Sequence, residues 1–137
     1  MFKRGVLRIL DANFNRAKEG LRVIEDVFRF ILEDDQLRRK LRNLRHSLDV
    51  IKRNKFFKNA IIDRDSKKDL GRRVDTLEIK RKNPCDILYI NFQRVKESLR
   101  VMEEFSKIIS PKDTRLLKKM RYDVYSLEKI SFSKYLA

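Results

Sequence analysis

The sequence contains few of the residues that interrupt or cross-link a chain: it has one cysteine, two prolines, three glycines and no tryptophan among 137 residues. The single cysteine, Cys85, excludes an internal disulfide and fits a reducing cytoplasm, and we expect it to be a small buried apolar residue. No apolar run approaches the roughly 18 residues of a membrane span. The opening MFKRGVLRIL lacks the apolar segment and cleavage site of a signal peptide. We therefore expect a cytoplasmic protein without a membrane segment.

The familiar motifs of nucleotide and metal sites are also missing. The sequence has no GxxxxGKS/T, no GxGxxG, no HExxH and no paired CxxC. A glycine-rich phosphate loop is thereby excluded. Any bound phosphate must be held by arginine side chains and helix N-termini.

Positive charge is in large excess, with 35 Lys and Arg against 20 Asp and Glu, a net charge of +15. This excess favours an anionic partner, either a nucleic acid, a phosphate compound or an acidic protein. Many of the charges alternate in sign at helical spacing, which is typical of a solvated helix surface. With 42% apolar residues, the chain is expected to be globular.

Apolar residues recur every three or four positions in four stretches, which predicts an all-α fold with four helices. The expected helices cover residues 6–33, 36–54, 84–109 and 111–130. Asp34 or Asp35 is expected to cap the second helix, and Asn83, followed by Pro84, to cap the third. A long loop of residues 55–83 separates the two helix pairs; residues 59–62 in it are read as a short strand or a helix end.

A second feature is an internal repeat at an offset of 78 positions, which duplicates polar as well as apolar residues. Asp11–Phe30 returns as Tyr89–Ile108, and Asn13, Arg16 and Glu19 return as Asn91, Arg94 and Glu97. We predict a single domain in which one hairpin, residues 6–54, and its copy, residues 84–131, form a four-helix bundle. Gly20, costly inside a helix, is expected to allow close approach of a backbone or ligand.

The duplicated polar residues are the main functional signal. A buried amide without a partner costs about 1–3 kcal/mol, so Asn13 and Asn91 must each bind a side chain, a ligand or one another. Arginine forks bind carboxylates and phosphates, so Arg16 and Arg94 are candidate ligand contacts. The alternative is that the duplicated Arg and Glu residues lock the two hairpins together through ion pairs.

Two further candidates lie outside the repeat. Asp63, Asp65 and Asp69, close to a turn at Gly71, have a spacing that would hold Mg²⁺ through one or two carboxylates. His46 is a candidate general base, although a lone histidine is usually a packed or surface residue. A loop as long as 55–83 inside a compact domain is usually functional or disordered, and its mixture of Asp, Ser and Arg favours a functional loop.

Four stretches, RILDANFNRAKEGLRVIEDVFRF, LRNLRHSL, RDSKKDLG and NFQRVKESLRVMEEFSK, resemble the small helical hydroxymethylpyrimidine phosphate kinase domain often fused to the N-terminus of thiamine phosphate synthase. The resemblance covers residues 7–130. It implies transfer of a phosphoryl group from ATP, with Mg²⁺, to 4-amino-5-hydroxymethyl-2-methylpyrimidine phosphate. The copy departs from the first repeat at Gln93 and Ser98, which replace Asn15 and Gly20, so one repeat alone is a candidate for ligand binding.

The motifs of the resemblance mark places and not mechanisms; from these places and the physical reasoning above we predict three sets of site residues. Substrate contacts are expected from Asn13, Arg16, Glu19, Arg22, Glu25, Asn91, Arg94, Arg100 and Glu103. Phosphate contacts are expected from Arg45 and Arg64. The catalytic set is His46, Asp65 and Asp69, of which the two aspartates are also the expected metal ligands.

Two other functions remain open. A basic helical module for RNA or DNA would explain the charge, but it gives no reason for duplicated Asn and Glu residues and has few aromatics for base stacking. A non-catalytic partner of thiamine phosphate synthase would explain the family resemblance without chemistry. A second copy of the chain is another expected partner, because the aromatic C-terminus would pack either on the core or on another subunit.

Overall fold

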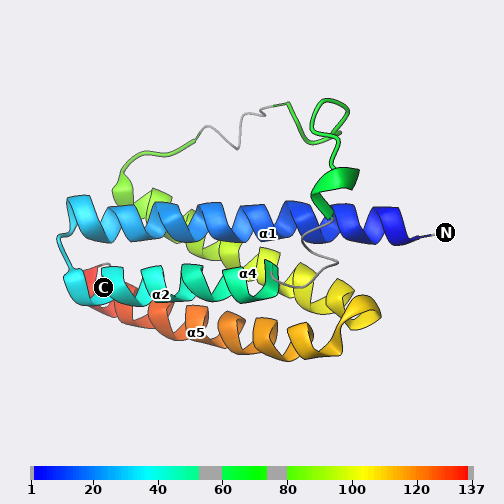
Figure 1. The fold of residues 1–137 in the computed structure, drawn as a ribbon. Helices are drawn as coiled ribbons and strands as arrows, with labels where there is room; N and C mark the ends of the chain where they lie inside the picture. The colour runs from blue at the N-terminus through cyan, green and yellow to red at the C-terminus, as the bar shows by residue number, and fades with distance from the viewer. Residues whose placement is uncertain (1, 53–59, 74–79, 136–137) are drawn as a thin grey trace.

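The structure, a computed structural model, describes residues 2–52, 60–73 and 80–135. Within these residues the regular elements are all helical, as predicted: α1 (Lys3–Asp26), η1 (Val27–Ile31), α2 (Asp35–Lys52), η2 (Ala60–Asp63), α4 (Pro84–Ile109) and α5 (Pro111–Tyr135). Figure 1 shows the four long helices packed along one another, with residues 64–73 of the joining segment above α1 in this view. No helix of the described residues is long and apolar enough to cross a bilayer.

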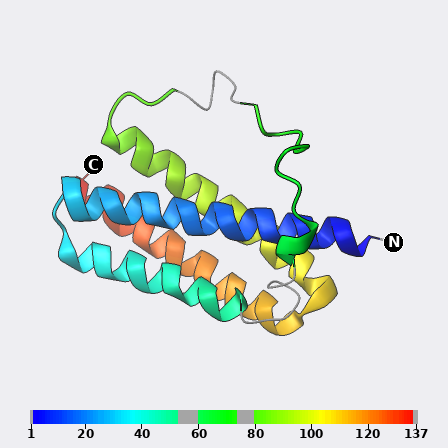
Figure 2. The same ribbon diagram turned by 45° about the horizontal axis from the view of Figure 1, so that its top comes forward.

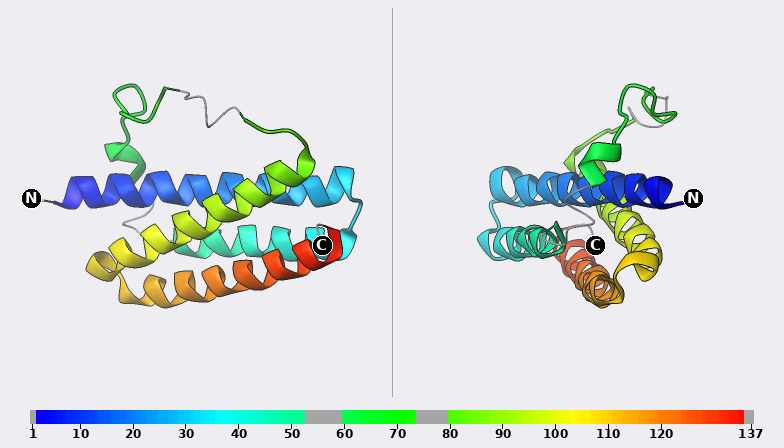
Figure 3. Two further views of the ribbon diagram at one scale, coloured as in Figure 1. Left: turned by 180° about the vertical axis from the view of Figure 1, so that it is seen from behind. Right: turned by 45° about the vertical axis from the view of Figure 1, so that its right-hand side comes forward.

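The helices form because each carries one apolar stripe that the others bury. α1 packs chiefly on α4, while α2 and α5 each pack on their own neighbour in sequence and touch one another little. Figures 2 and 3 show α4 crossing α1 at an angle, and the contact between these two helices is the most extensive in the described bundle. The fully buried side chains come from all four helices and include Leu10, Leu21, Ile24, Phe28, Leu41, Leu48, Ile51, Leu88, Phe92, Leu99, Met102 and Leu117.

The end of the first helix differs from the prediction of one helix over 6–33. The α-helix stops at Asp26, and Val27–Ile31 continues as a π-helix, in which the Leu32 N–H donates to the Val27 carbonyl at 3.0 Å. Glu33 then takes a positive φ of 50°, a conformation that side chains disfavour by about 1–2 kcal/mol. The wider turn and the left-handed residue together reverse the chain into α2.

The predicted capping residues are confirmed. The Asp34 carboxylate accepts the Leu37 N–H at 3.1 Å, and the Asn83 side chain accepts the Asp86 N–H at 3.0 Å. Each satisfies one of the backbone donors that a helix start leaves without a partner.

The segment between the hairpins is anchored to α1 at its start. Residues 60–63 form a 3-10 helix rather than a strand, with Ala60 fully buried. Arg64 then donates two hydrogen bonds of 2.7 Å to the buried carboxylate of Asp11 in α1. The predicted phosphate contact Arg64 therefore has its guanidinium fork on a carboxylate of the protein.

The C-terminal helix runs to Tyr135, five residues beyond the predicted end at 130. Lys134 Nζ and the Tyr135 hydroxyl both donate to Asp34 Oδ2 at 2.6 Å, and Phe132 and Tyr135 pack against the core. These aromatics thus cover the bundle itself; Leu136 lies outside the described residues. The expectation that Cys85 is buried is wrong, because it lies exposed in the first turn of α4.

The carboxyl group of Asp34 is expected to make the stability of the fold depend on pH. Burial raises the pKa of this carboxyl, but hydrogen bonds from Lys134, Tyr135 and the Leu37 N–H lower the pKa to about 2. A lowered pKa stabilises the fold above the ordinary value near 4, and this stability is lost as the pH falls toward 2. We expect Asp34→Asn, which keeps a good helix cap, to lower the free energy of unfolding by about 1–2 kcal/mol at pH 6.

The difference in the free energy of unfolding between Asp34→Asn and the wild type should disappear by about pH 2. Urea denaturation at successive pH values measures it. Asp123→Asn, which removes a carboxylate whose ion-pair partner among the described residues is the exposed Lys119, is the control and should change little. A gap for Asp34→Asn that stays constant down to pH 2 would contradict the assignment.

Candidate functional site

A groove of about 820 Å³ lies between α1 and α4. Each of the five α1 residues in its wall has its counterpart 78 positions later in α4 on the other side. The groove is lined by Asn13, Arg16, Glu19, Gly20, Val23, Asn91, Arg94, Glu97, Ser98 and Val101, together with Gly71 from the linking segment. The repeated sequence therefore meets itself across this groove.

Gly20 sets how closely the two helices approach. A Cβ at this position would lie 2.7 Å from Val95 Cγ2 and 3.7 Å from the Asn91 carbonyl oxygen, closer than the buried valine can accommodate. Gly20 was expected to admit a backbone or a ligand; what it admits most closely is the Val95 side chain of α4, while the Asn91 backbone oxygen lies at ordinary van der Waals distance. In α4 the equivalent position is Ser98, whose hydroxyl donates to the Arg94 carbonyl at 2.7 Å.

The two buried asparagines direct their amide donors to the backbone of their own helices. Asn13 Nδ2 donates to the Ile9 carbonyl at 2.9 Å, and Asn91 Nδ2 donates to the Ile87 carbonyl at 2.8 Å. Each amide thus has a hydrogen-bond partner, but this partner is the backbone carbonyl one turn back and not the side chain, ligand or second asparagine that was expected. This orientation leaves the side-chain oxygens as the acceptors at the groove; Asn13 Oδ1 accepts from Arg16 at 3.5 Å.

The charged residues of the groove are balanced and exposed. Arg16 and Arg94 contribute two positive charges, and Glu19 and Glu97 contribute two negative charges. Arg64 is held near these charges by Asp11. Its hydrogen bonds to Asp11 raise the pKa of its guanidinium group, and the negative charge of Glu19 raises this pKa further. An anionic ligand would meet two guanidinium groups from opposite walls.

The linking segment reaches the groove at Gly71. Asp69 Oδ1 accepts the Gly71 N–H at 2.7 Å, and Asp65 Oδ1 accepts the Lys68 N–H at 3.1 Å, so the predicted metal carboxylates hold tight turns. No group of three metal-ligating side chains occurs among the described residues. A Mg²⁺ at this site would be held mainly by nucleotide phosphates with one or two carboxylates, and Glu19 and Glu97 are the carboxylates within the groove wall.

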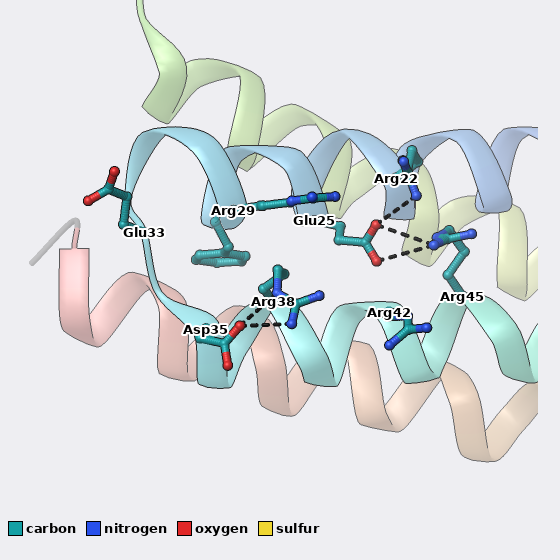
Figure 4. Close-up of a pocket in the computed structure, with 9 residues that line it drawn as sticks. Arg22, Glu25, Arg29, Glu33, Asp35, Arg38, Arg42 and Arg45 are labelled. Carbon is teal, nitrogen blue, oxygen red and sulfur yellow. Dashed lines mark hydrogen bonds and ion pairs between the residues drawn. The ribbon is translucent and has the colours of Figure 1, made fainter.

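Several predicted site residues lie elsewhere. Arg22, Glu25 and Arg45 line a separate cavity between α1 and α2 (Figure 4), and His46 is exposed on α2. Arg100 and Glu103 are not in the groove wall either. The predicted polar residues are therefore distributed between the groove and other parts of the molecule. The reason is that residues repeated in the sequence lie on different sides of their helices.

Glu25 and Glu103 instead form matching ion pairs. Glu25, 3% exposed, accepts from Arg45 at 3.3 Å, and Glu103, also 3% exposed, accepts from Arg121 at 2.6 Å. Each pair joins two helices of one hairpin rather than locking the hairpins to each other, which corrects that alternative. The sequence analysis did not identify Arg121 as a partner of Glu103. The spacing could have indicated it, because Arg121 follows Glu103 by 18 residues and Arg45 follows Glu25 by 20 residues.

Gly20 provides a test of the groove's construction. Gly20→Ala gains about 1 kcal/mol of helix propensity but forces Val95 to move, and overpacking costs about 1–3 kcal/mol. We expect a net loss of about 0–2 kcal/mol in the free energy of unfolding, measured by urea denaturation. Gly5→Ala in the same helix is the matched control, since nothing lies within 4 Å of a Cβ there, and it should be neutral or stabilising. Equal effects of the two substitutions would argue against the close approach.

Comparison with known proteins assigns the chain to a family. Residues 8–130, which include the whole groove wall, match one family model. This chain belongs to the ThiD2 family.

The ThiD2 match extends to curated proteins of thiamine biosynthesis. A thiamine-phosphate synthase of Prochlorococcus marinus is 40% identical over 126 residues, 91% of this chain and 35% of that protein. Those of Nostoc punctiforme and Rhodopirellula baltica are 42% and 39% identical over 90% of this chain, and 34% and 33% of their own lengths. The chain thus spans about a third of these relatives. No solved structure matches it.

Proposed function

We propose that this chain transfers a phosphoryl group from ATP to 4-amino-5-hydroxymethyl-2-methylpyrimidine phosphate, giving the pyrophosphate used in thiamine biosynthesis. The observation that carries the proposal is the groove between α1 and α4, in which the repeated Asn and Arg residues face one another. The ThiD2 membership and the synthase relatives support the pathway.

The groove has the size and the groups that such a substrate needs. Small-molecule sites commonly enclose about 300–1,000 Å³, and this groove offers about 820 Å³. The side-chain oxygens of Asn13 and Asn91 would accept hydrogen bonds from the pyrimidine amino group. Arg16 and Arg94 would hold phosphate oxygens through paired N–H donors.

The reaction needs positioning and charge neutralisation more than covalent catalysis. An oxygen of the substrate's phosphate attacks the γ-phosphorus of ATP, forming a new P–O bond. The bond between the γ-phosphorus and the β,γ-bridging oxygen breaks, and its electron pair leaves with ADP. Arg16 and Arg94 would stabilise the charge on the transferred group, and a Mg²⁺ carried by ATP would supply further neutralisation when bound.

The assay is direct. The purified chain is incubated with ATP, Mg²⁺ and the pyrimidine monophosphate, and ³¹P NMR follows the appearance of ADP and of the pyrimidine diphosphate in equal amounts. Omission of the pyrimidine is the control, since ADP formed without it reports simple hydrolysis. Absence of the diphosphate product at micromolar enzyme would reject the kinase.

A non-catalytic partnership with thiamine phosphate synthase is the second candidate, favoured by relatives in which the matching third belongs to a longer synthase. Co-elution with a separately expressed synthase, together with no turnover in the assay above, would support that function. A lone cysteine agrees with a cytoplasmic location for either function.

A further inference from the structure

A second cavity, of about 620 Å³, lies between the C-terminal end of α1 and α2, and it is rich in arginine. Figure 4 shows the side chains of the two helices gathered around it. Its wall contains Arg22, Glu25, Phe28, Arg29, Glu33, Asp35, Arg38, Arg42 and Arg45. Five arginines against three carboxylates leave a net charge of two positive.

The carboxylates in this wall do not satisfy all of the arginines. Glu25 is shared by Arg22 at 3.1 Å and Arg45 at 3.3 Å, and Asp35 pairs with Arg38 at 2.8 Å. Neither Arg29 nor Arg42 has an ion pair with a described residue. In addition, Arg45 Nε is buried without a hydrogen-bond partner in the described structure, a costly state for a donor. An acceptor with several oxygens would meet these needs.

The second hairpin is built differently at the equivalent place. The buried residues of α2 match those of α5 at an offset of 76 positions, as Leu41 and Leu48 match Leu117 and Val124. At these offsets Phe28 and Arg38 correspond to Ser106 and Thr114, whose hydroxyl groups hydrogen-bond directly at 2.6 Å. The cavity therefore depends on features that the first hairpin has alone, including the π-helix Val27–Ile31, a form often found at functional sites.

The cavity and the groove lie on different sides of α1. A helix turns by about 100° per residue, so Glu25 of the cavity wall is rotated by roughly 120–180° from all five α1 residues of the groove wall. An anion bound in the cavity is separated from the groove by the helix itself. This anion could therefore not be the phosphoryl group that reacts in the groove. The two sites are separate in space.

We propose that this cavity is a separate binding site for a diphosphate group, held between α1 and α2 by Arg29 and Arg42 with support from Arg38. A diphosphate offers oxygens to more than one guanidinium fork, which suits several arginines converging from two helices. The ligand would bridge the two helices. Its binding would raise the free energy of unfolding, and the increase would grow as the ligand concentration rises above its Kd. This inference does not rest on the proposed kinase activity.

The test uses isothermal titration calorimetry of the full chain with inorganic pyrophosphate at physiological salt. Arg29→Gln/Arg42→Gln is expected to weaken binding at least tenfold. The matched control is Lys107→Gln/Lys118→Gln, which removes the corresponding two charges of the second hairpin, both exposed, and should bind within twofold of the wild type. Circular dichroism checks the fold, and Arg29→Lys/Arg42→Lys, which keeps the charge but loses the forks, should still weaken binding.

Three outcomes would overturn the site: unchanged pyrophosphate binding in Arg29→Gln/Arg42→Gln, equal loss in the lysine control, or loss of all binding in Arg16→Gln/Arg94→Gln, which would place the anion in the groove. Titration with ADP beside pyrophosphate identifies the source of the ligand. Equal affinities indicate that the diphosphate group alone is recognised, and tighter ADP binding indicates a nucleotide.

Discussion

Arg94→Gln is expected to lower kcat/KM for the proposed phosphoryl transfer by about 10- to 100-fold, because a charged hydrogen bond to phosphate contributes about 1.5–3 kcal/mol. Arg94 lies in the groove wall on α4, across from Arg16 on α1. The measurement is the rate of diphosphate product formation at several substrate concentrations. A rise in KM alone would indicate a ground-state contact, and a fall in kcat a contact made in the transition state.

Arg100→Gln is the informative control for this variant. The repeat singles out both arginines, but Arg100 lies outside the groove, 57% exposed and near Glu103 and Glu104. It should retain activity within about twofold, a change equivalent to less than about 0.5 kcal/mol. Comparison of Arg16→Gln with Arg94→Gln then shows whether one wall or both hold the phosphates. Full turnover in Arg94→Gln would remove this arginine from the site.

Glu103→Ala is expected to lower the free energy of unfolding by about 3–5 kcal/mol, because it leaves Arg121 charged and buried without its partner. Glu103 and Arg121 are 3% and 9% exposed, and their two hydrogen bonds measure 2.6 and 3.3 Å. The carboxylate is also the main reason that the pKa of Arg121 is raised, against the effect of burial. Urea denaturation measures the loss.

Two comparisons make this result specific. Glu104→Ala removes the adjacent exposed carboxylate, which pairs with Lys107 at 2.9 Å, and should change the stability by no more than about 0.5 kcal/mol. Glu103→Leu/Arg121→Met should recover much of the loss, since apolar residues of similar volume often replace a buried pair without cost. A loss below about 1 kcal/mol in Glu103→Ala would show that the pair is open to solvent.

The candidate site was only partly visible in the sequence. The repeat predicted Asn13, Arg16 and Glu19 with their copies, and these residues do line one groove. The same repeat also singled out Arg22, Glu25 and Glu103, which lie in another cavity or in buried ion pairs. A repeat shows that two positions are equivalent, but it does not say which side of the helix faces the ligand.

The sequence by itself determined the number and most boundaries of the helices, because apolar spacing and capping residues such as Asn83 act over a few neighbouring positions. It could not predict the π-helix at Val27–Ile31 or the exposure of Cys85, which depend on how distant segments pack. The tertiary structure alone placed Gly20 against Val95 and Arg64 on Asp11. Contacts between residues far apart in the chain, unlike helical periodicity, are set by the packing of whole helices, and this packing decided which of the repeated arginines share the groove.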